Sequence, residues 1–361
     1  MRVNVIDPKK MTVSLCEMIN THGVYHLEKI PGEPDPDGLY LSPPWIDSHV
    51  HCFRAVTSFG LDPDNIGYKQ GVHLVVDAGS SGSETFQAMR EFIVEKSKTK
   101  VLAFLNISTV GHVTMREYYD MRCVDVDRTV RTLEENRDIL LGIKVRSSGI
   151  IVEDKGTLPL QKAVEAAEKA GCPILVHMGE TPPSNDDNLS LLRKGDIVTH
   201  CFHGKDTPLW HQDGTPTAAL ANALHRGVLM DVGHGAASFD CDVGRSAIHN
   251  GFKDFTISTD LHARSVNGPV YSLAHTMSKF LALGLSLVEV IRSVTLLPAE
   301  RFGLSGWCDN PTKNATLFRI INNDTQKNLY VDSKKKVIPV SKTIIPTKVL
   351  MNGKMIELNE L

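Results

Sequence analysis

Six residues that can bind a metal ion or carry a proton stand at or just after the ends of short apolar runs. They are His49 and His51 in WIDSHVH, Lys144 in LLGIKVR, His177 in CPILVH, His200 in DIVTH and Asp260 in FTISTD. Strands of one parallel barrel present their carboxyl ends at a common mouth, where polar residues usually serve a site. Four imidazoles, one carboxylate and one lysine gathered there predict a metal centre, and a hydrolase is the enzyme class that such a centre suggests.

The positions of the histidines strengthen the prediction of a metal site. Residues two apart on a strand point to the same side, so His49 and His51 can reach one ion. A lone histidine beside an apolar run is usually a core residue bonded to backbone, but four of them at the ends of three strands favour a shared site. Imidazole and carboxylate donors best suit zinc, with manganese, iron or cobalt as alternatives. Asp260 can complete the metal shell, and it can also serve as general base and then general acid.

Lys144 has two interpretations. An ammonium group at the end of an apolar strand must be paired, deprotonated or modified. The lysine can form an ion pair with Asp77 or Asp231, each near another strand end. It can instead react with CO₂, and the resulting carbamate is an anion whose two oxygens can bridge two metal ions.

Three further residues are predicted near the mouth as candidate substrate contacts. Arg146 follows Lys144 by two positions, so it points the same way and can bind a substrate carboxylate through two hydrogen bonds, or it can form a structural ion pair. His203 and His234 lie in loops that follow strands, and each can contact substrate or stabilise its own loop.

The elements that position these residues alternate regularly between strand and helix from about residue 43. Continuous apolar runs are typical of strands buried on both faces of a parallel sheet. The predicted strands are 43–47, 72–77, 101–107, 140–145, 173–177, 196–200, 227–232 and 255–260. The predicted helices are 84–98, 126–138, 160–170, 189–193, 218–226 and 243–250. Eight strands in this pattern predict an α/β fold, a (β/α)₈ TIM barrel over residues 43–305.

The two ends of the chain are β-rich and differ from the middle. Residues 1–42 and 306–361 contain short alternating segments, and Asn352-Gly353 is a strong signal for a hairpin turn. We expect the two ends to pair into one small β-sandwich domain beside the barrel.

Composition limits the classes of partner. The chain has 361 residues, a net charge of −3 and 42% hydrophobic residues, which is ordinary for a globular enzyme and gives no case for nucleic acid or an anionic membrane surface. The longest apolar runs have the length of strands and are far too short for a membrane span. Seven cysteines without paired spacing disfavour a disulfide framework, and no signal peptide is visible, so a cytoplasmic enzyme with a small-molecule substrate is expected. A homo-oligomer remains an open expectation.

Longer motifs make the pattern specific. The stretches GIKVR, VHMGETPP, GDIVTHCFHGK, DVGHGAASF and NGPVYSLAHTMSKFLALG resemble the amidohydrolase superfamily, in its two-metal branch with a carboxylated lysine, and within it the amidohydrolase/deacetylase group once labelled dihydroorotase-like. The resemblance covers about residues 43–305 and implies a TIM barrel with a β-sandwich from both chain ends. It also implies two divalent ions, usually zinc. In that scheme His49, His51 and Asp260 hold the buried ion, His177 and His200 hold the outer one, and N6-carboxylated Lys144 lies between them.

The chain departs from the family pattern near the mouth. His203 stands where asparagine is expected, and Leu261-His262-Ala263 replaces the usual isoleucine-tyrosine after Asp260. These changes concern the pocket for the substrate and leave the metal donors intact.

The resemblance implies hydrolysis of the amide or ester bond of a small acetylated amino or hydroxy acid. A hydroxide that bridges the two ions would attack the carbonyl, with Asp260 as the proton carrier. Three alternatives stay open. The first is a cyclic amidohydrolase of the dihydroorotase or hydantoinase kind. The second is a one-metal deaminase in which Glu180 of His177-Met-Gly-Glu protonates the substrate. The third is a relative that has lost turnover.

Overall fold

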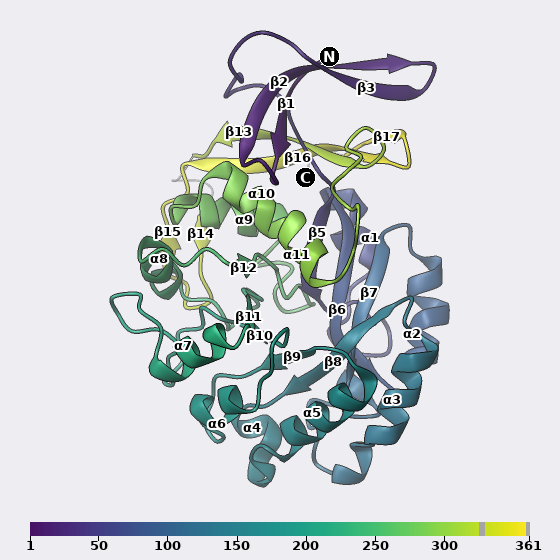
Figure 1. Ribbon diagram of the computed structural model, residues 1–361, viewed down its shortest axis with the longest axis vertical. Helices are drawn as coiled ribbons and strands as arrows, with labels where there is room; N and C mark the ends of the chain where they lie inside the picture. The colour runs from purple at the N-terminus through teal and green to yellow at the C-terminus, as the bar shows by residue number, and fades with distance from the viewer. Residues whose placement is uncertain (325–328, 359–361) are drawn as a thin grey trace.

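The computed structural model describes residues 1–324 and 329–358 and contains the predicted eight-stranded barrel (Figure 1). Each strand pairs in parallel with its neighbours in chain order. The last and first strands meet through a bridge between Val50 and Leu261, which closes the barrel. The barrel strands are β5 (Trp45–Val50), β6 (Val72–Gly82), β7 (Lys100–Asn106), β8 (Leu140–Arg146), β9 (Ile174–His177), β10 (Ile197–Thr199), β11 (Leu229–Asp231) and β12 (Phe255–Thr256).

The first and last strands differ from the prediction. Strand β5 runs on to Val50, so His49 lies within the strand and not beyond its end. Strand β12 has only two residues, and Asp260 therefore follows its end by four positions. The reason is local: the backbone N–H and the hydroxyl of Thr259 donate to the Asp47 carboxylate at 3.0 and 2.6 Å, and this diverts the chain from regular pairing.

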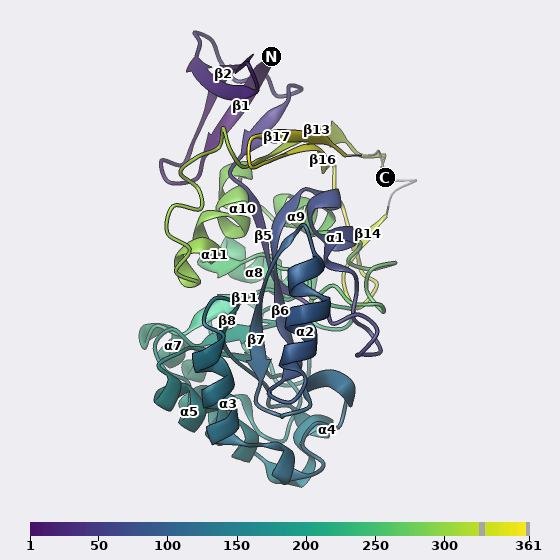
Figure 2. The ribbon, with the colours of Figure 1, turned by 90° about the vertical axis from the view of Figure 1, so that its right-hand side faces the viewer.

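Helices cover the outside of the barrel, with α2, α3 and α5 side by side on one flank (Figure 2). The predicted helix at 189–193 was misplaced, because Ser184 caps an earlier helix and forms a capping box with Asp187. The predicted helix at 84–98 is also shorter, since it ends at Phe92 and continues as a 3₁₀ turn. The helices are α1 (Pro63–Ile66), α2 (Phe86–Phe92), α3 (Val126–Glu135), α4 (Gly149–Val152), α5 (Leu158–Ala170), α6 (Asn185–Ser190), α7 (Ala218–His225), α8 (Cys241–His249), α9 (Leu273–Ala282), α10 (Leu287–Val294) and α11 (Leu296–Arg301). Among the described residues, none of these helices is long and apolar enough to cross a membrane.

Both chain ends build the small β domain, which lies at the top of Figure 1. Its seven strands form one sheet in the order β17-β16-β13-β4-β1-β2-β3. Asn352 and Gly353 form the predicted turn of the β16–β17 hairpin, both with positive φ (52° and 80°). The strands are β1 (Arg2–Asp7), β2 (Thr12–Thr21), β3 (Val24–Lys29), β4 (Tyr40–Ser42), β13 (Ala315–Asn322), β16 (Lys342–Met351) and β17 (Lys354–Glu357).

A separate short hairpin, β14 (Tyr330–Val331) and β15 (Val337–Ile338), leaves this sheet and lies against the barrel. Its turn residue Ser333 donates to the carbonyl oxygens of His234 and Gly235 at 3.3 and 3.1 Å. The C-terminal segment therefore supports the loop that follows β11.

Candidate metal centre

All six residues predicted for the metal centre border one cavity of about 250 Å³ at the carboxyl ends of the barrel strands. Strand β5 supplies His49 and the adjoining His51, and β8 and β9 supply Lys144 and His177. Residues just past β10 and β12 supply His200 and Asp260. Residues more than two hundred positions apart in the sequence thus meet at one mouth because the barrel closes.

The Asp260 carboxylate contacts both histidines of the first strand. Its Oδ1 lies 3.2 Å from Nε2 of His51 and 3.6 Å from Nε2 of His49. The main chain fixes this arrangement, since the Asp260 N–H donates to the His49 carbonyl oxygen at 2.7 Å. Both imidazoles therefore turn Nε2 toward the carboxylate.

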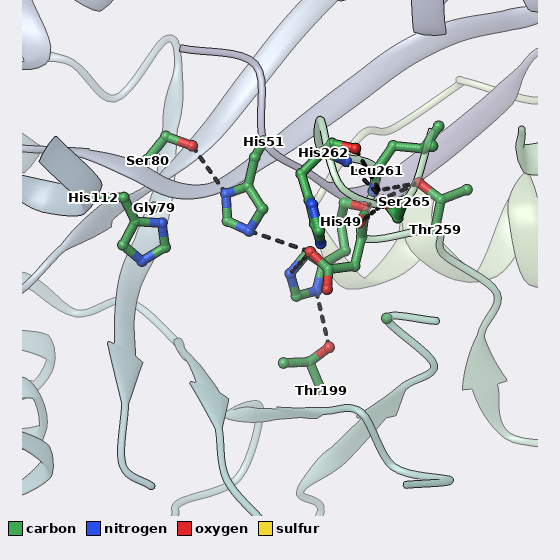
Figure 3. A network of polar contacts seen from close by, with 12 residues as sticks. His49, His51, Gly79, Ser80, His112, Thr199, Thr259, Leu261, His262 and Ser265 are labelled. Carbon is green, nitrogen blue, oxygen red and sulfur yellow. Dashed lines mark hydrogen bonds and ion pairs between the residues drawn. The ribbon is translucent and has the colours of Figure 1, made fainter. Parts of the chain in front are cut away.

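The Nδ1 atoms of His49, His51 and His200 each have a polar partner. Nδ1 of His51 lies 2.9 Å from the hydroxyl of Ser80, as Figure 3 shows, and Nδ1 of His200 lies 2.6 Å from the Gly233 carbonyl oxygen. Such outer partners fix the tautomer and orientation of histidines that ligate metals.

His49 has the most elaborate support. Its Nδ1 lies 2.9 Å from the Thr199 hydroxyl and 3.3 Å from the Asp231 carboxylate. Asp231 also accepts hydrogen bonds from buried hydroxyls, those of Ser48, Thr199, Thr256 and Ser258.

The protonation states suit metal binding. Burial lowers the pKa of His177 to about 3, and it lowers the pKa of His51 and of His200 well below the ordinary value. These imidazoles are neutral at pH 7 and offer lone pairs. Burial alone would raise the pKa of Asp260, but His49 and His51 beside it hold that pKa well below the usual range, so the carboxylate is ionised.

Backbone strain is concentrated at two of these positions. His200 and Asp260 have positive φ angles of 62° and 50°, which residues with a Cβ rarely adopt. Such strain persists where the surroundings impose it, commonly at functional sites. A Cβ at Gly235 would lie 2.4 Å from Oδ2 of Asp260, so only glycine fits the loop that passes this carboxylate.

Lys144 is almost completely buried, with 1% of its surface exposed. Burial lowers its pKa to about 8, so about a tenth of the amine is neutral at pH 7. Neither carboxylate considered as its ion-pair partner takes that role, since Asp77 accepts from the backbone of Cys52 and Ser80, and Asp231 accepts from hydroxyls and His49. The described residues contain no salt bridge to Lys144, so its amine faces the cavity without a carboxylate partner.

The predicted substrate contacts lie elsewhere or are already engaged. Arg146 lines the cavity, but its guanidinium forms a buried ion pair with Glu117, with Nε 3.0 Å from each carboxylate oxygen. His234 lies outside the cavity lining, with Nε2 2.8 Å from the amine of Lys279. His203 borders a different surface cavity next to Lys205. Arg146 therefore has the structural ion pair that the sequence left open.

Four further residues complete the wall beside His51: Phe59, His112, His262 and Arg264; of these the sequence placed His112 near the mouth. The His112 and His262 rings both pack near Phe59, with ring centroids 5.6 and 5.7 Å from it. They come from loops after β5, β7 and β12. The departure from the family pattern at Leu261-His262-Ala263 was the signal that could have identified His262.

The donor set fits a divalent metal. One ligand atom each from His49, His200 and Asp260 lies within 4.8 Å of the others, although the resemblance assigned His200 to the outer ion. His51 and His177 border the same group, with ring centroids 5.7 Å from His49 and 4.6 Å from His200, respectively. Neutral imidazoles and an ionised carboxylate are the donors that zinc and similar ions prefer.

Comparisons with known proteins identify relatives of the chain. A protein of Brucella anthropi named a deacetylase is 39% identical over 274 residues, which span 75% of this chain and 68% of that protein. A protein of Enterococcus faecalis, also named a deacetylase, is 36% identical over 324 residues, 88% of this chain and 87% of its own length. No protein-family model matches the chain.

Two solved structures superpose over nearly the whole chain. A crystal structure described as a dihydroorotase has a TM-score of 0.88 at 32% identity and covers 99% of this chain and 96% of its own. A crystal structure described as an adenine deaminase has a TM-score of 0.87 at 32% identity and covers 99% of both chains. The two solved structures therefore share both the barrel and the terminal β domain with this chain.

Proposed function

The chain belongs to the amidohydrolase superfamily, and we propose that it is a two-metal deacetylase acting on a small acetylated amino or hydroxy acid. One observation carries the proposal: the six donors of the two-metal pattern all border one cavity in a chain whose relatives are named deacetylases. The membership makes the chain a hydrolase, and the acetylated substrate is the step proposed here.

Two divalent ions, with zinc preferred, would be held by His49, His51 and Asp260 on one side and by His177 and His200 on the other. Lys144, carboxylated on its amine, would stand between them. The buried amine without a carboxylate partner supports this assignment, because a carbamate supplies the anionic charge that the ions need. When bound, the ions would lower the pKa of a water molecule and polarise the scissile carbonyl group.

Asp260 performs the proton transfer in this proposal. Its ionised carboxylate takes the proton of the attacking water and then delivers it to the leaving nitrogen or oxygen. The hydrogen bond to the His49 carbonyl and the tight fit against Gly235 hold the carboxylate in place. The products are acetate and the free amino or hydroxy acid.

The deaminase alternative assigns the acid role to Glu180, and the geometry argues against it. Glu180 is not among the residues that line the cavity, and its carboxylate pairs with Lys205 and accepts from the Ser148 hydroxyl. Although partial burial alone would raise the pKa of Glu180, His177, Lys205 and Ser148 together hold it below the usual range. An ionised carboxylate outside the cavity is a poor proton donor for a substrate ring.

The cyclic amidohydrolase alternative uses the same metal chemistry, and the similarity to a structure described as a dihydroorotase favours it. Substrate comparison separates the two. We expect the zinc-loaded protein to release acetate from N-acetyl amino acids or O-acetyl hydroxy acids, measured by a coupled acetate assay. Opening of dihydroorotate or hydantoin rings without acetate release would replace the deacetylase by a cyclic amidohydrolase.

A further inference from the structure

The cavity must hold more of the substrate than its acetyl group, and its wall beside His51 offers groups that the proposed mechanism does not use. Phe59, His112, His262 and Arg264 form this wall. The proposed substrate is an acid, so its carboxylate needs a cation or strong hydrogen-bond donors within the cavity.

Arg146 is not free for this task. Its Nε and Nη2 are directed at Glu117, and Nη2 also donates to the Met115 carbonyl oxygen at 3.1 Å. Glu117 is completely buried, and Arg146 neutralises its charge. The donor edge that would bind a substrate carboxylate through two hydrogen bonds is therefore already occupied by Glu117.

Arg264 differs in this respect. It lines the cavity four positions after Asp260, and no carboxylate among the described residues forms a salt bridge with it. Its backbone N–H donates to Nδ1 of His262 at 3.1 Å, and the residue is exposed to solvent. It is therefore a cation at the mouth without a fixed protein partner.

His112 is the second unused group. It is buried, with 3% of its surface exposed, and neither ring nitrogen makes a hydrogen bond with a described residue. Its Nε2 lies 3.4 Å from Oε1 of Glu117, but that oxygen is taken by Arg146 and Asn106. Its ring centroid is 5.1 Å from that of His51. Figure 3 shows the two rings next to each other. The Nδ1 of His112 is buried without a hydrogen bond to any described residue, and a buried nitrogen of this kind costs free energy unless a ligand completes it.

We propose that Arg264 and His112 form the subsite for the acid group of the substrate, with Arg264 supplying the charge and His112 a buried hydrogen bond. Phe59 packs against both His112 and His262, with ring centroids 5.6 and 5.7 Å away, and the backbone N–H of Arg264 donates to His262. This inference rests on the proposed function for its choice of substrate, and it names the residues that determine specificity.

The test uses two pairs of compounds, and each pair consists of a carboxylate and its neutral carboxamide. The first pair can be hydrolysed and the second cannot. N-acetylglycine and its carboxamide report turnover. Levulinate and levulinamide, in which a methylene group replaces the amide nitrogen, report binding by calorimetry and cannot be hydrolysed. The zinc-loaded wild type is compared with Arg264→Gln, Arg264→Lys and His112→Phe, and with Arg131→Gln as a control at an exposed arginine on α3.

We expect the wild type to prefer each carboxylate over its neutral partner. Arg264→Gln should lower that preference on the order of tenfold to a hundredfold, the range for a hydrogen bond to a charged group. Arg264→Lys should restore part of it, and His112→Phe should weaken levulinate binding while the metal content stays at the wild-type value. Arg131→Gln should match the wild type.

The outcomes separate the two proposals. If the protein prefers levulinate over levulinamide and Arg264→Gln abolishes that preference, the subsite is supported. If the same protein releases acetate from no acetylated acid, the deacetylase is rejected. Acetate release with a preference that survives Arg264→Gln would keep the deacetylase and overturn the subsite. A wild type that binds levulinate no better than levulinamide would also overturn it.

Discussion

Gly79 lies directly beneath Lys144, and its replacement by alanine tests whether the position of this lysine controls the metal centre. Gly79 has φ of +80°, and a Cβ built there would lie 2.4 Å from Cβ and 2.5 Å from Cγ of Lys144. These separations are about 1 Å inside ordinary contact distance, so the stem of Lys144 must move. The same glycine accepts a hydrogen bond from the side chain of Asn106 through its carbonyl oxygen, which limits the relief that the backbone can offer.

Gly195 supplies a matched control, with φ of +88° and nothing within 4 Å of a built Cβ. Gly195→Ala should cost only the left-handed backbone penalty, about 1–2 kcal/mol. Gly79→Ala should cost that amount plus about 1–3 kcal/mol for overpacking, so about 2–5 kcal/mol in total. The difference between the variants isolates the contact with Lys144.

Urea unfolding of both variants measures the stability costs, and elemental mass spectrometry measures the bound metal. We expect Gly195→Ala to keep the wild-type metal content and Gly79→Ala to lose metal, because the proposed centre needs Lys144 between its two ions. Equal stability costs with equal metal content in the two variants would refute the reasoning.

Three further predictions concern buried charges and hydrogen bonds around the barrel. Burial lowers the pKa of His73 to about 4 from an ordinary value near 6.5, so its stabilising contribution is full above pH 6.5 and is lost as the pH falls through 4. Between pH 7 and pH 5 this one group should cost about 2 kcal/mol, and urea unfolding of His73→Gln should lack that part of the acid loss. Glu117→Gln leaves the Arg146 guanidinium buried without its anion, so the free energy of unfolding should fall by about 3–5 kcal/mol, measured at pH 7. Asp231→Asn removes the carboxylate behind His49 and should weaken metal affinity about tenfold to a hundredfold in a competition assay with a chelator.

Each of these has an outcome that contradicts it. An unchanged acid profile in His73→Gln would assign the loss to other groups. A Glu117→Gln protein as stable as the wild type would show that Arg146 finds water or another partner. Unaltered metal affinity in Asp231→Asn would mean that the Thr199 hydroxyl alone orients the imidazole.

The barrel and the convergence of the six residues on one cavity could be predicted because both depend on short-range signals. Continuous apolar runs identify buried parallel strands, and the closure of the barrel brings their ends together whatever the loops do. His177 and Lys144 illustrate this, since each ends an apolar run and each borders the cavity.

The loops could not be predicted in the same way. Glu117 forms an ion pair with Arg146 although the two are 29 positions apart. Only the conformation of the loop after β7 brings them together. His234 and His203 follow strands as expected but turn away from the cavity, whereas His112 turns into it. The position of helix α6 was recoverable, because the Ser184 cap with Asp187 is a sequence signal for a helix start.

The most direct test of the proposed centre is the metal content of the purified protein beside that of Lys144→Ala, with the surface variant Lys162→Ala as control. Metal-free protein is reloaded with zinc in the presence and in the absence of bicarbonate, and bound zinc is counted by elemental mass spectrometry. We predict two ions per chain in the wild type and in Lys162→Ala, a requirement for bicarbonate, and clearly fewer ions in Lys144→Ala. One ion in all three proteins, with or without bicarbonate, would contradict the carbamate-bridged centre.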